Sequence, residues 1–300
     1  MVEKSEVKIA YIMQCHKNPQ QINRLISKLQ SDTVDFYVHV DRKSEIQPLI
    51  EKYGNLVFVP EDDRVNVRWG DYSQCEATLA LMSCVISSGK SYDFVWLISG
   101  QDYPIKSLGR IDAFLQERKN CTFINFTPEN WVNYPRWKKR NELYHFPWMI
   151  GTGTATKILR RLWYFITGGR GYTLRIFKRK SPFVKEYFGS SWWCMPYDCM
   201  REVFSLSQRP EVRAYFSHSI NPDESMFQTL YMHAECHHSK RIHDYLTYVD
   251  WSAGRSNPKI LTKADERALL CDQNDFLIAR KFDMDVDTDI LDSIDEAIGK

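Results

Sequence analysis

The sequence predicts an α/β fold in which a mainly parallel central sheet is covered by helices on both faces. Short apolar segments alternate with segments of helical spacing through the first 126 residues. Several of the apolar segments are continuous runs such as "VKIAYIM" (7–13), the pattern of a strand buried on both faces. The chain has 300 residues, of which 43% are hydrophobic, so it can fill a large core.

The predicted elements follow one another in a regular order. The expected strands are 7–13, 35–41, 56–60, 93–100 and 121–126. The expected helices are 19–29, 45–53, 73–87 and 108–117. Ligands of parallel sheets bind at the carboxyl ends of the strands. The strand ends "MQCHKNP", "HVDRKS" and "ISGQDYP" therefore mark the expected site.

Composition excludes some classes of function. The net charge is +2 and the pI is near 8.0, too balanced for nucleic-acid binding by bulk charge. We find no signal peptide and no apolar run that spans a bilayer, and therefore expect the eight cysteines to be reduced and the chain to be cytoplasmic. No repeat or linker is visible, so we expect one domain with halves 1–126 and 127–300.

The stretch "SINPDESMFQTLYMH" (219–233) has two interpretations. Asn221 is a good N-cap, Pro222 fits the first helical position, and Glu224 can reach back to the cap in a capping box. The local pattern therefore favours a helix start. The adjacent carboxylates Asp223 and Glu224 are also the groups that an enzyme needs for acid–base chemistry.

Three other motifs have a structural explanation. "GTGTAT" (151–156) lacks the third glycine of a dinucleotide loop. "HAECHHSKRIH" (233–243) could bind zinc, but its spacing matches no known pattern, and histidines also stabilise helix ends. "FDMDVDTD" (282–289) contains Asp-x-Asp triplets but leads into an acidic helix, so we interpret it as a helix start.

Nine segments, taken in order, resemble the core-2/I-branching enzyme family. They span about 9–287 and are "IAYIMQCHKNPQQINRLI", "FYVHVDRKS", "WGDYSQCEATL", "LISGQDYPIKS", "RWKKR", "GSSWWCM", "NPDESMFQTL", "YVDWS" and "FLIARKFDMDVD". The resemblance implies a Rossmann-like nucleotide-sugar transferase fold of the GT-A type, with residues 1–126 as the nucleotide-sugar-binding half and 127–300 as the acceptor and catalytic half. It also implies catalysis without a metal or other cofactor, and Glu224 as the catalytic base.

The resemblance further implies a set of donor-binding residues. Asp41 matches the aspartate that contacts the nucleoside, although on position alone a strand-end cap is equally expected. Gln14 matches a residue near the uracil. Lys281 matches a lysine that neutralises the diphosphate. A second cation is expected from a loop of different length, where Arg255 is our choice and Lys259 the rival.

Acceptor-binding residues follow in the same way. The resemblance places Arg136 and Trp251 at the acceptor, and we add Asp102 from "ISGQDYP" and Trp192 from "GSSWW". Neighbours on a strand face opposite ways, so we expect at least one of Trp192 and Trp193 to lie in the core.

The predicted reaction transfers a sugar from a UDP-sugar to a hydroxyl of a glycan or lipid-linked glycan, with inversion to a β-linkage. Ser191 stands where xylosyltransferase relatives tend to carry aspartate, so we expect UDP-GlcNAc, with UDP-xylose as the alternative. The apparent lack of an anchor favours a bacterial enzyme of surface polysaccharide over a truncated Golgi enzyme. Alternatives of other classes are a non-catalytic sugar-binding module and a zinc hydrolase.

The segment 156–180 mixes eight basic residues with aromatic and aliphatic ones and has no acidic residue. This composition predicts peripheral contact with the inner face of an anionic membrane. In the alternative, the apolar residues pack on the sheet and the arginines face water.

Overall fold

The structure, a computed structural model, describes residues 6–146, 153–166, 174–244, 246–254, 257–271 and 275–299. At its centre lies a seven-stranded sheet of order β10-β6-β9-β4-β1-β2-β3. These strands are β1 (Ile9–Cys15), β2 (Val34–Val40), β3 (Leu56–Phe58), β4 (Phe94–Ser99), β6 (Cys121–Ile124), β9 (Trp193–Pro196) and β10 (Arg241–His243). Within this sheet β9 runs antiparallel to both of its neighbours, whereas the other pairs are parallel. The predicted α/β class and mainly parallel sheet are confirmed.

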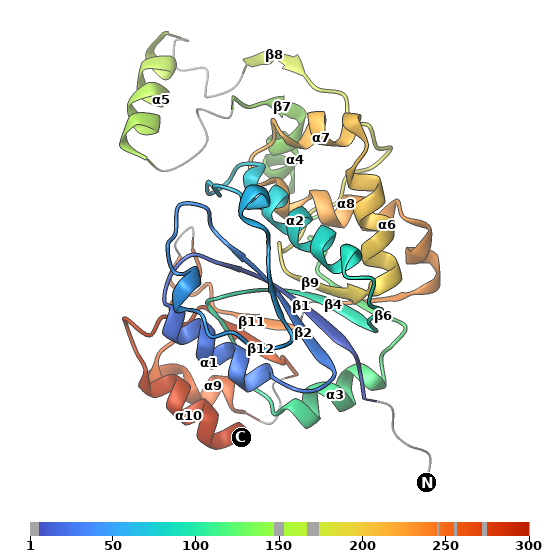
Figure 1. Ribbon diagram of the computed structural model, residues 1–300. Helices are drawn as coiled ribbons and strands as arrows, with labels where there is room; N and C mark the ends of the chain where they lie inside the picture. The colour runs from blue at the N-terminus through green and yellow to red at the C-terminus, as the bar shows by residue number, and fades with distance from the viewer. Residues whose placement is uncertain are drawn as a thin grey trace.

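Helices cover both faces of this sheet (Figure 1). One face carries α1 (Pro19–Leu29), α3 (Leu108–Gln116) and α10 (Asp289–Ile298). The other carries α2 (Ser73–Ser87), α6 (Tyr197–Ser207), α7 (Pro210–Phe216) and α8 (Met226–Met232). Strand β1 shows why: Tyr11 and Met13 belong to the first core cluster, and Ala10 and Ile12 to the second. A strand with two buried faces must be largely apolar, as β1 is.

A small second sheet brings the end of the chain back to the centre. Its order is β11 (Thr247–Val249), β12 (Ile278–Arg280) and β5 (Asp102–Pro104). In the antiparallel β12–β5 pair, Arg280 stands opposite Asp102. The short helix α9 (Glu266–Leu269) lies between β11 and β12 in the chain. This sheet places Arg280 and Lys281 beside the carboxyl end of β4.

Two local predictions are wrong. The expected helix 45–53 is only a 3-10 turn, Gln47–Leu49, because Pro48 inside such a helix has no N–H to donate and its ring clashes with the preceding turn. The expected capping box at Asn221 does not form. Asn221 has a left-handed backbone (φ 48°) without a side-chain cap, and Pro222–Glu224 is a 3-10 turn ahead of α8. The carboxylate of Glu224 is thereby directed to another partner.

Four elements follow one another early in the predicted half 127–300: α4 (Tyr134–Glu142), β7 (Leu143–Tyr144), α5 (Thr154–Ile166) and β8 (Leu174–Lys178), of which β7 pairs with β8. Of these, α5 projects from the rest of the molecule (Figure 1). In α5 the side chains of five apolar residues are 43–85% exposed, namely Ile158, Leu159, Leu162, Phe165 and Ile166. The alternative prediction, that these residues pack on the sheet, is therefore wrong. "GTGTAT" lies partly outside the described residues, and its end forms the start of α5.

Candidate active site

A cavity of about 750 Å³ opens at the carboxyl ends of β1, β2, β4 and β6, as expected for a parallel sheet. Residues that follow each of these strands line it, including His16, Asp41, Gly100 and Asn125. Because β9 runs in the opposite direction, its amino end meets the same edge. The segment 189–192 therefore lines the cavity as well.

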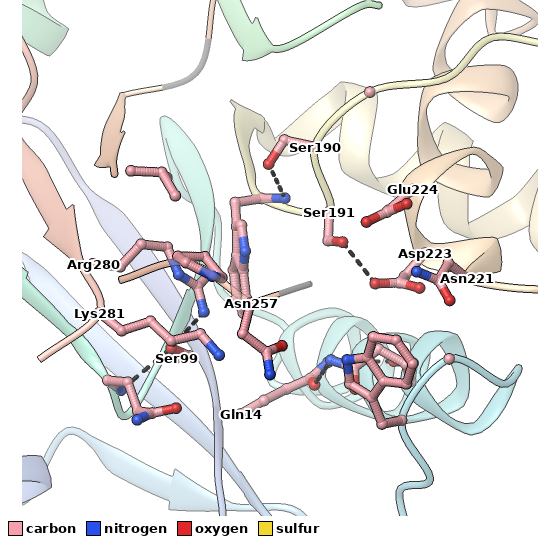
Figure 2. Close-up of a pocket in the computed structure, with 18 of the residues that line it drawn as sticks. Gln14, Ser99, Ser190, Ser191, Asn221, Asp223, Glu224, Asn257, Arg280 and Lys281 are labelled. Atoms are coloured by element: carbon pink, nitrogen blue, oxygen red, sulfur yellow. Dashed lines mark hydrogen bonds between the residues drawn. The ribbon is translucent and has the colours of Figure 1, made fainter. Parts of the chain in front are cut away.

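One wall of the cavity is cationic and comes from the small sheet (Figure 2). Arg280 is buried, with its Nε 3.4 Å from Asp102 Oδ1 and its guanidinium 3.7 Å from the ring of Trp192. Lys281 follows it and lines the cavity. Burial and the neighbouring Arg280 lower the pKa of Lys281, while Asp102 opposes this shift. An anion entering here would meet positive charge in a partly dehydrated setting.

The floor of the cavity contains Gln14 and Asp41, at the ends of β1 and β2. Gln14 Nε2 donates to Thr78 Oγ1 at 2.7 Å, and its Oε1 accepts from Gln74 Nε2 at 2.5 Å. Asp41 is 6% exposed and accepts from the backbone N–H of Lys43 at 3.2 Å. Both side chains are thus fixed in direction by protein contacts.

The opposite wall is acidic (Figure 2). Asp223 accepts a hydrogen bond of 2.6 Å from Ser191 Oγ, and Glu224 pairs with Arg140 of α4. Burial and the adjacent Asp223 raise the pKa of Glu224 to about 7, although Arg140 and a hydrogen bond with Asn221 oppose this rise. Glu224 is therefore a carboxylate that can accept and release a proton near neutral pH.

Gly189 fixes this wall against the sheet. Its backbone N–H donates to the carbonyl of Glu224 at 2.9 Å. A Cβ at Gly189 would lie 1.9 Å from the carbonyl oxygen of Asn125, which follows β6. Only glycine allows the chain to pass this closely, so the glycine of "GSSWW" has a structural reason.

Comparison with known proteins identifies the family. The model of the Core-2/I-Branching enzyme family matches residues 9–273. The chain belongs to this family. The family predicted from the sequence is therefore confirmed, and with it membership in a family of glycosyltransferases.

Curated relatives include Xylosyltransferase 2 of Rattus norvegicus and Xylosyltransferase oxt of Drosophila pseudoobscura pseudoobscura. Each is 22% identical, over 96% and 97% of this chain respectively. The chain spans about a third of the length of these relatives, 33% in both cases. Among solved structures, the apo form of mouse Xyloside xylosyltransferase 1 aligns with 91% of this chain and 97% of its own, at 10% identity and a TM-score of 0.38.

The structure gathers most of the site residues that were predicted from the sequence. Those that line the cavity are Gln14, Asp41, Trp192, Glu224, Trp251 and Lys281. Trp193 is 1% exposed and belongs to the core, whereas Trp192 faces the cavity, as expected for neighbours on a strand. Their roles in binding and catalysis stay predictions.

Three predicted site residues are not among those that line the cavity, and a fourth falls outside the described residues. Asp102 is 1% exposed and accepts hydrogen bonds from Ser99, so its contact with the site runs through Arg280. Arg136 is exposed and is not among the lining residues. Lys259 is paired with Asp265 at 2.5 Å, outside the cavity lining. Arg255 lies outside the described residues.

Sequence reasoning missed several lining residues and one that stands behind them. The missed lining residues include Trp69, Trp131, Trp137, Asn257 and Arg280. Arg140, four residues after Arg136 and thus one helical turn along "RWKKR", contacts Glu224. Trp69 and Arg140 stood inside segments already matched to the family, and helical spacing could have singled out Arg140.

Side chains of the two candidate metal-binding motifs form hydrogen bonds with other protein groups. Within the described ranges, no group of three or more His, Cys, Asp or Glu side chains is placed to hold a metal ion. Asp283 accepts from Lys17 and Asn18, and Asp287 accepts from the backbone of Lys263 at 3.0 Å. In "HAECHHSKRIH", ring nitrogens of His233 and His237 bond to nearby backbone carbonyls.

Proposed function

We propose that the chain is an inverting glycosyltransferase that moves a sugar from a UDP-sugar to a hydroxyl of a glycan, with Glu224 as the base. The observation that carries this proposal is the placement of Glu224, with a pKa raised to about 7, across one cavity from Arg280 and Lys281. A base on one wall and fixed cations on the other match the two charges that a displacement at the anomeric carbon develops.

In the proposed reaction the acceptor oxygen attacks the anomeric carbon and forms the new C–O bond. Its proton passes to Glu224. The bond from the anomeric carbon to the diphosphate oxygen breaks on the opposite face, and UDP leaves with the electron pair. An α-linked donor then gives a β-linked product. Lys281 stabilises the leaving diphosphate as a fixed cation, so we propose that no metal is required.

The identity of the donor rests on two opposing observations. Ser191, which donates to Asp223, favours UDP-GlcNAc, as predicted from the sequence. The names of the relatives, all xylosyltransferases in the comparison above, favour UDP-xylose. A screen of UDP-sugars for hydrolysis and for a rise in melting temperature decides between them. Hydrolysis of no UDP-sugar, together with binding of free glycans, would instead support a sugar-binding module.

We also propose that α5 contacts the cytoplasmic face of an anionic membrane, where a lipid-linked glycan acceptor would be presented. Its exposed apolar residues recur at the spacing of one helical face, and Lys157, Arg160 and Arg161 occupy the rest of the helix. Each cation near an anionic leaflet contributes about 1 kcal/mol. No helix in the described ranges is long and apolar enough to cross a membrane.

Co-sedimentation with phosphatidylglycerol vesicles tests this contact. We expect binding at low salt, weaker binding at high salt, and a clear loss in Leu162→Asp. Val184→Asp serves as the matched control, because Val184 is an exposed apolar residue that lies outside α5. Equal recovery of the unaltered protein in the supernatant with and without vesicles would refute the proposal.

A further inference from the structure

Arg140 lies behind the cavity wall and contacts Glu224 directly. Its Nη1 pairs with Glu224 Oε2, and both side chains are only 26% exposed. The guanidinium also lies over the ring of Trp137, with Cζ 4.4 Å from the ring centre. Trp137 lines the cavity, whereas Arg140 does not. Arg140 thus joins the carboxylate to an aromatic side chain of the cavity wall.

The end of α4 is tied to the 220–225 segment by further contacts. The backbone N–H of Ile220 donates to the carbonyl of Arg140 at 3.2 Å. The side chain of Asn141 donates to Ser225 Oγ at 3.1 Å. Ion pair, backbone bond and side-chain bond together hold Glu224 at a fixed distance from α4, which itself belongs to a different part of the chain.

We propose that Arg140 is a positioning residue that keeps the carboxylate of Glu224 ionised and oriented in the cavity. This inference rests on the proposed function, in which Glu224 is the base. A general base must be ionised and fixed in direction before the acceptor arrives. Guanidinium suits this role, because it stays charged at all relevant pH values and stacks on an aromatic ring.

The charges next to Glu224 include a second carboxylate, whose effect on the pKa of Glu224 is opposed by Arg140. The neighbouring Asp223 is half-buried and raises the pKa of Glu224. Helix α2 packs against the Pro222–Glu224 turn, and its Cys75 lies near Asp223 and also near Asp71 and Glu76. Arg280 and Lys281 stand on the opposite wall. Without Arg140, burial and Asp223 would act with less opposition, and the pKa of Glu224 would rise from about 7.

Glutamate-labelled protein provides a direct readout. The ¹³C signal of the Glu224 carboxyl, assigned by its absence in Glu224→Gln, is titrated in the unaltered protein, Arg140→Gln and Arg140→Lys. We expect the pKa of Glu224 to rise by about one or more in Arg140→Gln and to change less in Arg140→Lys, which keeps the charge. Lys139→Gln, which removes an exposed cation from the same helix, should leave it unchanged.

The pH profile of kcat/KM gives the second readout. Because the base must be ionised, activity rises with pH through the pKa of Glu224. The acid limb should therefore move to higher pH in Arg140→Gln, and activity at a fixed pH on that limb should fall about tenfold if the pKa of Glu224 rises by about one. The loss should shrink at high pH, which a merely misfolded variant would not show.

The two ways in which this can fail are distinct. A titration of Glu224 in Arg140→Gln that matches the unaltered protein overturns the role of Arg140. Full turnover by Glu224→Gln overturns the proposed function instead. Melting curves establish that each variant is folded, and Arg140→Lys keeps the test valid if Arg140→Gln does not fold.

Discussion

The two walls of the cavity carry opposite charge and are held in different ways. The cationic wall follows a strand: Arg280 ends β12, opposite Asp102 of β5. The acidic wall stands on a short 3-10 turn, Pro222–Glu224, which is held by contacts from α4 and from Gly189. Regular backbone pairing fixes the first wall, and side-chain and loop contacts fix the second. The second wall should therefore be the more sensitive to single substitutions away from the cavity.

The largest effect is expected at the acidic wall itself. Glu224→Gln should lower the rate of transfer by about 10²-fold or more, because the amide cannot accept a proton. Binding of UDP, measured by calorimetry, should be unchanged, since UDP is expected at the other wall. Near-normal turnover would remove Glu224 from the mechanism and leave the acidic wall without a function.

The cationic wall is tested by Lys281→Ala. Loss of one charge-assisted hydrogen bond, about 1.5–3 kcal/mol, should weaken UDP binding by about 10- to 100-fold. Uridine, which has the same base and ribose but no diphosphate, is the control ligand and should bind almost as before. Equal weakening of both ligands would mean that Lys281 supports the fold of the site instead of contacting the diphosphate.

The support of the acidic wall is tested by Gly189→Ala. The added Cβ would meet the carbonyl oxygen of Asn125 at 1.9 Å, so backbone must shift. We expect a loss of about 1–3 kcal/mol in the free energy of unfolding, measured in urea, together with reduced transfer. Gly109→Ala is the matched control, because nothing lies within 4 Å of its added Cβ. Similar stability of the two variants would contradict the close approach of Gly189 to Asn125.

The smallest effect is expected from removal of metal. Transfer should be the same in excess EDTA, because the charge that faces the diphosphate is proposed to come from protein groups. Re-addition of Mn²⁺ or Mg²⁺ is the control for an effect of EDTA itself. Strict dependence on either ion would show that protein cations alone do not neutralise the diphosphate. Asp283 and Asp287 would then be the candidate metal ligands.

Local pattern was sufficient for the elements with two buried faces. Strands such as 7–13 are largely apolar because both faces of the sheet are covered, and the order of strands and helices then limits the topology. Pattern was insufficient at the 221–225 turn. A capping box and a catalytic carboxylate need the same residue types, so the sequence pattern fits both interpretations. The left-handed backbone of Asn221 rules out the capping box, and this backbone conformation depends on contacts with distant segments.

By itself, then, the sequence determined the fold class, the edge of the sheet that carries the site, and the family. These follow from continuous apolar runs, from helical spacing and from ordered motifs, which depend on neighbours along the chain. Only the tertiary structure decided that Arg140 pairs with Glu224, that Arg280 stacks on Trp192, and that the apolar face of α5 is exposed. Those features depend on how distant segments of the chain pack together. Trp192 and Arg280, for example, are 88 residues apart in the sequence, and a local sequence pattern cannot show that they are in contact.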